Sequence, residues 1–181
     1  MFEIDKSLRF FSKDNRHNGW IIYGLIDMMC DISKMSDNIK HFELVEIGSF
    51  WGESSIIMSS FSFVTKFHSV DLYAREELKE RLKPITQFKE CIISADGSEG
   101  YSKKIKDSSI DMVYIDANHN YDSVKRDLGL WGPKVKQGGF ICGHDYCQTF
   151  DGVIKAVDEY VANHNLTVYK TYTDTSYLIR K

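Results

Sequence analysis

The most constraining feature of the sequence is an apolar segment, residues 42–47, that runs into a turn with two glycines, Gly48 and Gly52. A run of Phe, Leu, Val and Ile is typical of a buried strand. Gly48 lets the backbone turn without interference from a Cβ atom, and a helix is expected to follow over about 53–62. The first N–H groups of that helix point into the space beside the turn. The stretch therefore predicts a strand, a ligand-binding turn and a helix.

The residues of this turn indicate a cationic nucleoside as its ligand. The middle glycine of the dinucleotide pattern G-x-G-x-x-G is missing, which argues against a pyrophosphate. Glu46, at the end of the predicted strand, would repel a phosphate but attract an ammonium group. The residues expected to hold such a ligand here are Glu46, Gly48, Ser49, Gly52 and Ser54.

Length and composition indicate one domain and a small-molecule partner. A chain of 181 residues with 43% hydrophobic content suits a single domain over 1–181, in which residues 1–40 form a helical segment that could cover a substrate. The net charge of −3, without a basic block, argues against nucleic acid. No apolar run approaches the ~18 residues that span a membrane. Four cysteines without a C-x-x-C pair suggest reduced thiols and a cytoplasmic protein, with neither disulfides nor zinc.

Periodicity along the chain predicts strands alternating with helices, which is the pattern of an α/β fold with a mainly parallel sheet. A closing hairpin adds one antiparallel strand. Turns are expected at 95–98, at Gly138-Gly139 and at Thr173-Asp174. The predicted helices cover about 19–33, 53–62, 75–87 with a break near Pro84, 121–131 and 151–163, and the strands cover 42–47, 64–71, 90–94, 110–115, 140–142, 166–172 and 175–180.

Acidic residues follow several of the predicted strands. Because ligands bind outside the carboxyl ends of the strands in open α/β sheets, these residues are expected to share one crevice. Asp71 lies about 20 positions after the glycine turn, where an acidic residue accepts ribose hydroxyls in nucleoside-binding units. The alternative is an Asp that only ends a strand and begins a turn. The crevice would gather Glu46, Asp71, Asp96, Asp116, His144 and Asp145, and so many carboxylates call for bound cations.

Three segments resemble class I S-adenosylmethionine-dependent methyltransferases: E-x-G-x-x-x-G at 46–52, D-M-V-Y-I-D-A-N-H-N-Y at 111–121 and G-G-F-I-C-G-H-D-Y at 138–146. The last two are similar to a branch of small-molecule O-methyltransferases that includes macrolide-sugar and catechol-type enzymes. The resemblance implies a Rossmann-like sheet of seven strands in the order 3-2-1-4-5-7-6, with S-adenosylmethionine as cofactor. It also implies that Asp96 reaches the adenine edge, although Asp-Gly is a common turn dipeptide as well.

The same resemblance implies that Asp116 and Asp145 bind magnesium and that His119 is the general base. Oxygen ligands suit a hard divalent ion in any family. His144 departs from the pattern, because several magnesium-bound relatives carry a carboxylate there, and an imidazole admits manganese, iron or no metal. His144 is therefore a metal ligand, an orienting residue or a structural histidine. His119 has a second interpretation, a cap of the helix that begins near Tyr121.

The expected function is O-methylation of a small hydroxylated molecule, either a sugar or a catechol-like compound. One alternative is a module that binds S-adenosylmethionine without turnover. Another is an NAD(P)-dependent short-chain reductase, because Tyr121 and Lys125 spell Y-x-x-x-K, although the third glycine of such enzymes is replaced by Ser54. The sequence leaves a homo-oligomer open.

Overall fold

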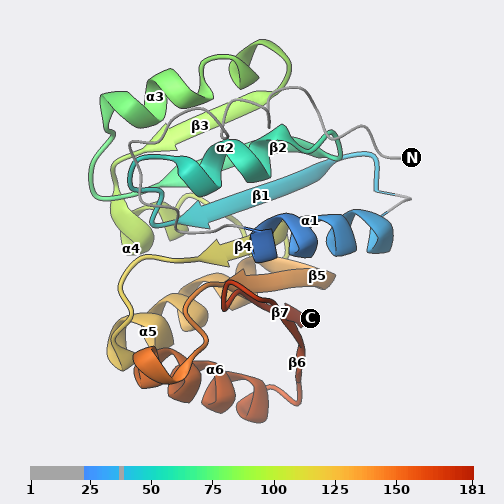
Figure 1. The fold of residues 1–181 in the computed structure, drawn as a ribbon, viewed down its shortest axis with the longest axis vertical. Coiled ribbons are helices and arrows are strands. Elements are labelled where there is room, and N and C mark those ends of the chain that lie inside the picture. The colour runs from blue at the N-terminus through green and yellow to red at the C-terminus, as the bar shows by residue number, and fades with distance from the viewer. Residues whose placement is uncertain (1–22, 37–38) are drawn as a thin grey trace.

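The computed structural model describes residues 23–36 and 39–181, and it shows an α/β fold (Figure 1). The helices are α1 (Tyr23–Met35), α2 (Glu53–Ser60), α3 (Glu76–Leu82), α4 (Gly97–Ser102), α5 (Tyr121–Trp131) and α6 (Asp151–Asn163). The strands are β1 (Phe42–Ile47), β2 (Val64–Val70), β3 (Glu90–Ser94), β4 (Ile110–Ile115), β5 (Val135–Gly143), β6 (Val168–Thr171) and β7 (Tyr177–Arg180).

The strands form one sheet of seven in the order β3-β2-β1-β4-β5-β7-β6. Neighbours from β3 to β5 pair in parallel, and β7 runs antiparallel to both β5 and β6. This confirms the predicted class, strand order and closing hairpin. The carboxyl ends of β1, β2, β3, β4 and β5 therefore lie along one edge of the sheet.

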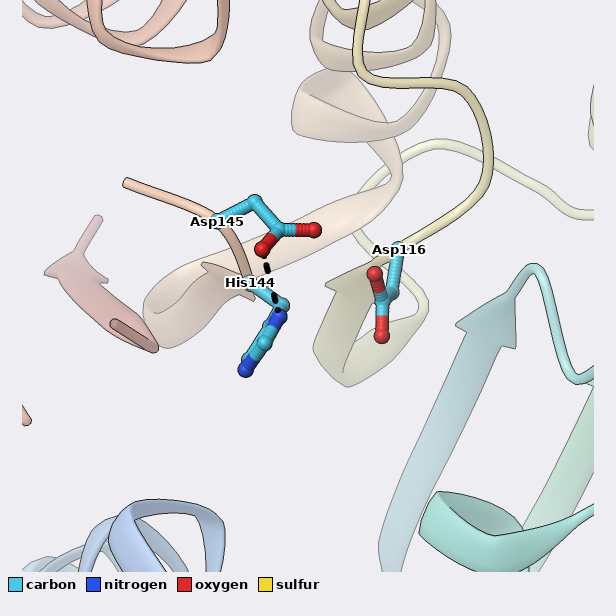
Figure 2. Close-up of side chains that lie close together, drawn as sticks. All are labelled: Asp116, His144 and Asp145. Carbon is cyan, nitrogen blue, oxygen red and sulfur yellow. Dashed lines mark ion pairs between the residues drawn. The ribbon is translucent and has the colours of Figure 1, made fainter. Parts of the chain in front are cut away.

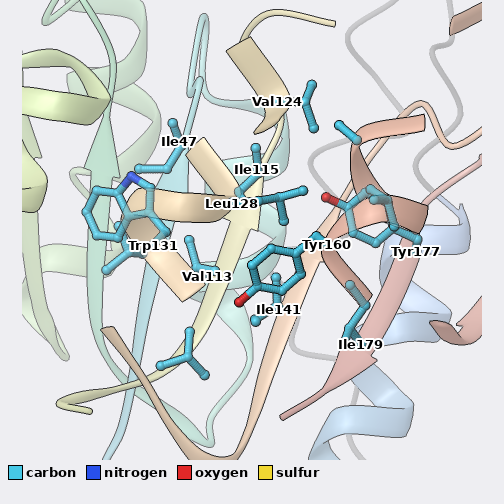
Figure 3. Packing of buried hydrophobic residues seen from close by; sticks show 14 of the residues in the cluster. Ile47, Val113, Ile115, Val124, Leu128, Trp131, Ile141, Tyr160, Tyr177 and Ile179 are labelled. Carbon is cyan, nitrogen blue, oxygen red and sulfur yellow. The ribbon is translucent and has the colours of Figure 1, made fainter. Parts of the chain in front are cut away.

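Helices cover both faces of the sheet, which explains why the central strands are apolar in almost every position. Val113 and Ile115 of β4 pack toward α5 and α6, where Trp131 is fully buried (Figure 3). Met112 and Tyr114 of the same strand pack on the other face, with side chains of α1, α2 and α3. A strand that is buried on both faces reads as a continuous apolar run rather than as an alternating one.

Several predicted elements differ from the structure. Gly138-Gly139 was expected to be a turn before a short strand, but both residues lie inside β5. The prediction was wrong because the C-terminus pairs with this segment, Gly138 N–H donating to Lys181 O at 2.7 Å and Lys181 N–H to Gly139 O at 2.9 Å. Residues 97–102, of which 97–98 were expected in a turn, form α4. Residues 19–22 of the first predicted helix lie outside the described residues.

The interruption of the third predicted helix is confirmed. α3 ends at Leu82, and after Pro84 the chain makes only a short 3-10 turn over Ile85–Gln87. In the part of the chain that the structure describes, no helix has both the length and the apolar composition needed to cross a bilayer.

Candidate active site

The carboxyl edge of the sheet carries a cavity of about 1490 Å³. Most of the predicted site residues line it, although they come from five different strand ends. The residues that do so are Gly48, Ser49, Ser54, Asp71, Asp96, Asp116, His119, His144 and Asp145. Glu46 and Gly52 do not line the cavity, and both are buried.

The glycine turn after β1 is held close to the neighbouring strand end. Gly48 has φ +93°, and its N–H donates to Val70 O at 2.8 Å. A Cβ atom at Gly48 would lie 2.2 Å from Asp116 O, so no other residue fits without displacement of the backbone. Gly52, with φ +88°, precedes α2. The turn itself therefore packs against the end of β4.

Glu46 supports this turn from inside the protein. Its side chain is fully buried and accepts hydrogen bonds from the hydroxyls of Ser54 and Ser55 in the first turn of α2. Burial raises the pKa of Glu46 to about 7, against the effect of the two serine hydrogen bonds. Ser55 was not singled out in the sequence. In this arrangement both carboxylate oxygens of Glu46 are bound by serines of α2 rather than exposed at the turn.

Asp71 and Asp96 lie at the ends of β2 and β3. Asp71 accepts hydrogen bonds from Phe50 N–H at 2.8 Å and from Leu72 N–H at 2.7 Å. These bonds fix the carboxylate at the cavity wall and leave it acceptor capacity. Asp96 is bound by Lys104 Nζ at 2.8 Å and by the Ser94 hydroxyl. The Lys104 hydrogen bond lowers the pKa of Asp96, so this carboxylate is ionised at neutral pH.

Four ionisable side chains meet where β4 and β5 end. His119 Nε2 lies 3.0 Å from Asp145 Oδ2 and 3.5 Å from Asp116 Oδ1, and His144 Nδ1 lies 3.1 Å from Asp145 Oδ1. In Figure 2 the carboxylate of Asp145 lies above the His144 ring, and the carboxylate of Asp116 lies to the right of both. Asp116, His144 and Asp145 each offer one ligand atom, and these atoms lie within 4.8 Å of one another. The predicted metal ligands are thus brought together.

Burial and the neighbouring charges shift the pKa values of all four side chains of the cluster. Burial raises the pKa of Asp116. Burial opposes ionisation of Asp145 too, but the hydrogen bond from His144 and the two imidazoles outweigh it and lower the pKa. Burial alone would lower the pKa of His144, yet the hydrogen bond to Asp145 and the nearby carboxylates raise it to about 9. The contact with Asp116 raises the pKa of His119, against the effect of burial.

The backbone of the cluster is also unusual. Asp145 has φ +62°, a left-handed conformation that Asp tolerates better than most residues. The carboxylate of Asp145 contacts both histidines, and Cys147 N–H donates to Asp145 O at 2.8 Å to close the turn. Such conformations persist where the surroundings hold them in place, often in active sites.

His119 does not cap α5. The N-cap residue is Asn120, whose side chain accepts a hydrogen bond from Ser123 N–H at 2.9 Å. The helix-cap interpretation of His119 is therefore wrong. His119 instead stands between two cavities, because it also lines a smaller one of about 600 Å³. Phe150, whose ring lies 4.7 Å from the His119 ring, lines both cavities as well.

Sequence reasoning missed several residues of the site. Asp174 was predicted only as a turn residue, but it lines the larger cavity, and its carboxylate accepts Leu25 N–H at 2.6 Å. It thereby fastens the start of α1 to the β6–β7 hairpin. Phe150 carries no polar group that would have drawn notice. The predicted hairpin could have revealed Asp174, because its turn at Thr173-Asp174 lies at the carboxyl edge of the sheet.

The side chains of the Y-x-x-x-K pair make their hydrogen bonds to each other and to α6, not to the cluster. Lys125 Nζ donates to Tyr121 Oη at 2.6 Å, and Tyr121 Oη donates to Glu159 Oε2 at 2.5 Å. The pair thus forms a link between α5 and α6 with an acidic partner. Phenol and ammonium are indeed neighbours, as the helical spacing predicts. Because both side chains bond Glu159 of α6, their position is explained by the packing of α5 against α6.

Comparison with known proteins agrees with this geometry. Residues 45–146, more than half of the chain, match the family described as a methyltransferase domain. No curated protein sequence gives a match.

Solved structures of similar fold include an O-methyltransferase from Bacillus cereus in complex with SAH, at TM-score 0.69 and 10% identity, covering 97% of this chain and 89% of that one. A methyltransferase from Geobacter sulfurreducens has TM-score 0.68 and 12% identity, with 100% and 91% coverage. The O-methyltransferase NovP has TM-score 0.62 and 16% identity, with 87% and 79% coverage. These likenesses establish the fold. Together with the family match, they show that the chain belongs to the S-adenosylmethionine-dependent methyltransferases of class I fold.

Proposed function

We propose that the protein transfers a methyl group from S-adenosylmethionine to a hydroxyl oxygen of a small molecule that resembles a sugar or a catechol. The observation that carries the proposal is the cluster of two carboxylates and two histidines at the ends of β4 and β5, beside the larger cavity. An oxygen nucleophile must lose a proton during methyl transfer, and this cluster offers a proton acceptor where the cofactor cavity ends.

The cofactor would be held along the ends of β1, β2 and β3. The Gly48–Ser49 turn would lie against its amino-acid part, near the charge of buried Glu46. Asp71, fixed by three backbone N–H groups, would accept the ribose hydroxyls. Asp96 would lie nearer the adenine, although Lys104 competes for its carboxylate.

The residues present also fit a divalent metal. Asp116, His144 and Asp145 supply two carboxylates and one imidazole within 4.8 Å, a set that suits Mg²⁺ less well than Mn²⁺. When bound, such an ion would supply a Lewis acid that lowers the pKa of the acceptor hydroxyl.

His119 would take the proton of the acceptor hydroxyl as the oxygen attacks the methyl group and S-adenosylhomocysteine leaves. Its imidazole stands at the boundary of the two cavities and is 36% exposed, so a bound molecule can reach it. In the structure, Asp116 and Asp145 hold this imidazole beside the two cavities. The acceptor would occupy the space next to His119 and Phe150.

A ligand panel tests this function. Thermal unfolding would be followed with S-adenosylmethionine, S-adenosylhomocysteine, NADH, Mg²⁺ and Mn²⁺ added separately, because a ligand that binds only the native state raises its stability. We expect stabilisation by the two adenosyl compounds and not by NADH. Turnover with vicinal diols and catechols would then be measured before and after chelation. Tight binding without turnover of any diol or catechol would favour a binding module.

We also propose that the protein acts in the cytoplasm on a free small molecule rather than on nucleic acid. The four cysteines are unpaired, with Cys142 fully buried, and the charges of the chain are mixed. Residues 1–40 are proposed to belong to the same domain and to cover the substrate. Gel filtration would test whether the protein is a homo-oligomer.

A further inference from the structure

The side chain of His119 contacts the same two carboxylates, Asp116 and Asp145, that a metal ion would bind. A single nitrogen, Nε2, faces Asp145 Oδ2 at 3.0 Å and Asp116 Oδ1 at 3.5 Å. The other oxygen of Asp145 faces His144 Nδ1 at 3.1 Å. Both oxygens of Asp145 are thus engaged by histidines. Divalent ions take carboxylate oxygens at about 2.0–2.6 Å, well inside these contacts.

Nε2 of His119 thus lies between the two carboxylates, so a divalent ion that bridges Asp116 Oδ1 and Asp145 Oδ2 would take its place and displace the imidazole. His144 can turn a ring nitrogen from the carboxylate to the ion and remain a ligand, since it belongs to the group of ligand atoms within 4.8 Å. His119 lies outside that group. Its side chain is 36% exposed, whereas that of His144 is 23% exposed, so His119 is the freer of the two.

The two cavities beside His119 leave room for its side chain to rotate. Its ring packs edge-on against Phe150 at 4.7 Å, and both residues line the smaller cavity as well as the larger one. The residues next to it, Asn118 and Asn120, are held by their own hydrogen bond, from Asn120 N–H to Asn118 Oδ1 at 3.0 Å. A rotation of the His119 side chain would leave that loop unchanged and turn Nε2 toward the cavities.

We propose that His119 and a divalent metal compete for Asp116 and Asp145, so that metal binding releases the imidazole toward the acceptor. The inference rests on the proposed function and deepens it. His119 holds the two carboxylates together until the metal takes them, and the released imidazole then faces the hydroxyl from which it removes a proton. Binding of the metal and exposure of the His119 imidazole to the acceptor hydroxyl therefore occur together.

Metal affinity, measured without turnover, tests the proposal. Isothermal titration of the full chain with Mn²⁺ at one fixed pH would compare the wild type with His119→Ala, His119→Lys and His41→Ala. Removing a hydrogen-bonded competitor from a carboxylate should tighten Mn²⁺ binding about 10-fold or more in His119→Ala. His119→Lys restores a competing cation and should bind no tighter than the wild type. His41 is exposed and precedes β1 at the opposite edge of the sheet, so His41→Ala should have no effect.

Equal or weaker Mn²⁺ binding by His119→Ala would overturn the proposal, and weaker binding would make His119 a ligand. Absence of Mn²⁺ binding in every variant would overturn it too. Circular dichroism would confirm that the variants fold, and imidazole ¹⁵N signals of the wild type provide a second test. Mg²⁺ should shift the His119 Nε2 signal, and an unmoved signal at saturation would contradict release.

Binding of S-adenosylhomocysteine in the same samples separates this inference from the proposed function. If the protein binds S-adenosylhomocysteine but His119→Ala and the wild type bind Mn²⁺ equally, the proposed function stands and the inference about His119 fails. A chain that does not bind S-adenosylhomocysteine loses the proposed function, whatever His119 does to Mn²⁺ affinity.

Discussion

Replacing Glu46 by Gln should make the protein more stable and its cofactor binding weaker. Glu46 is fully buried, and its pKa is raised from the ordinary value of 4.5 to about 7 by burial. The native state therefore binds a proton more tightly here than the unfolded state does. The free energy of unfolding falls as pH rises through the window from 4.5 to about 7, by about 3 kcal/mol in total.

The neutral amide of Gln removes most of this pH-dependent loss. It can still bond the hydroxyls of Ser54 and Ser55, one as acceptor and one as donor, but these bonds are weaker than bonds to a carboxylate by about 1 kcal/mol. At pH 8 we therefore expect Glu46→Gln to be more stable than the wild type by roughly 1–2 kcal/mol. Near pH 4.5 the gain should vanish, since the wild-type carboxyl is then protonated in the native state.

Urea unfolding at pH 5, 6, 7 and 8 would measure the effect, with Glu80→Gln as the control. Glu80 lies on α3 with its side chain 70% exposed, so its replacement should leave the pH profile unchanged. Calorimetry at pH 8 should show S-adenosylmethionine binding weakened by roughly 3- to 10-fold, because the ammonium group loses an attractive charge. A stability difference between Glu46→Gln and the wild type that stays constant from pH 5 to pH 8 would refute the reasoning.

Three further variants test other parts of the site. Asp71→Ala should weaken S-adenosylmethionine by about 10- to 150-fold in calorimetry through loss of hydrogen bonds to a carboxylate, and an unchanged dissociation constant would remove Asp71 from the site. His119→Ala should lower turnover by roughly 10²- to 10⁴-fold with cofactor affinity unchanged, and normal turnover would exclude it as the base. Gly48→Ala should destabilise the protein by at least roughly 1–3 kcal/mol in urea, because φ is +93° and the new Cβ would meet Asp116 O. Gly129→Ala, where a Cβ meets nothing within 4 Å, is the matched control and should be neutral or stabilising.

The elements with strong local signals were predictable from the sequence. The strand–turn–helix around Gly48 and the run of strands ending on carboxylates follow from apolar periodicity and from the rule that parallel strands end at one edge. The extension of β5 back to Val135 was not predictable in this way. It depends on pairing between Gly138-Gly139 and the C-terminal Lys181, which local propensity does not report.

The site shows the same division between local and long-range information. Asp71, Asp116 and Asp145 could be placed at the cavity because each lies within two residues of the end of a strand. The burial of Glu46 could not be anticipated, since it depends on the serines of α2 closing over its carboxylate. The pairing of His119 with Asp145 also joins the ends of two strands, and Asp145 has a left-handed backbone that strand periodicity does not predict.

Replacing His144 by Asp should change the metal preference of the site. The present donors are two carboxylates and an imidazole, and imidazole favours Mn²⁺ over Mg²⁺, which prefers oxygen. With a third carboxylate, Mg²⁺ affinity should rise by about 10-fold or more, and the ratio of Mn²⁺ to Mg²⁺ affinity should fall.

The same replacement removes an imidazole whose pKa is raised to about 9, and hence a positive charge, from beside Asp116 and Asp145. Without added metal, His144→Asp should therefore unfold at lower urea concentration than the wild type, because three neighbouring carboxylates repel one another. Saturating Mg²⁺ should reverse this loss by binding the native state. Calorimetry and urea unfolding, each with and without Mg²⁺, would measure both effects, with His144→Asn as the neutral control. If His144→Asp and His144→Asn bind Mg²⁺ equally, position 144 does not reach the metal, and the carboxylates of Asp116 and Asp145 alone would have to hold it.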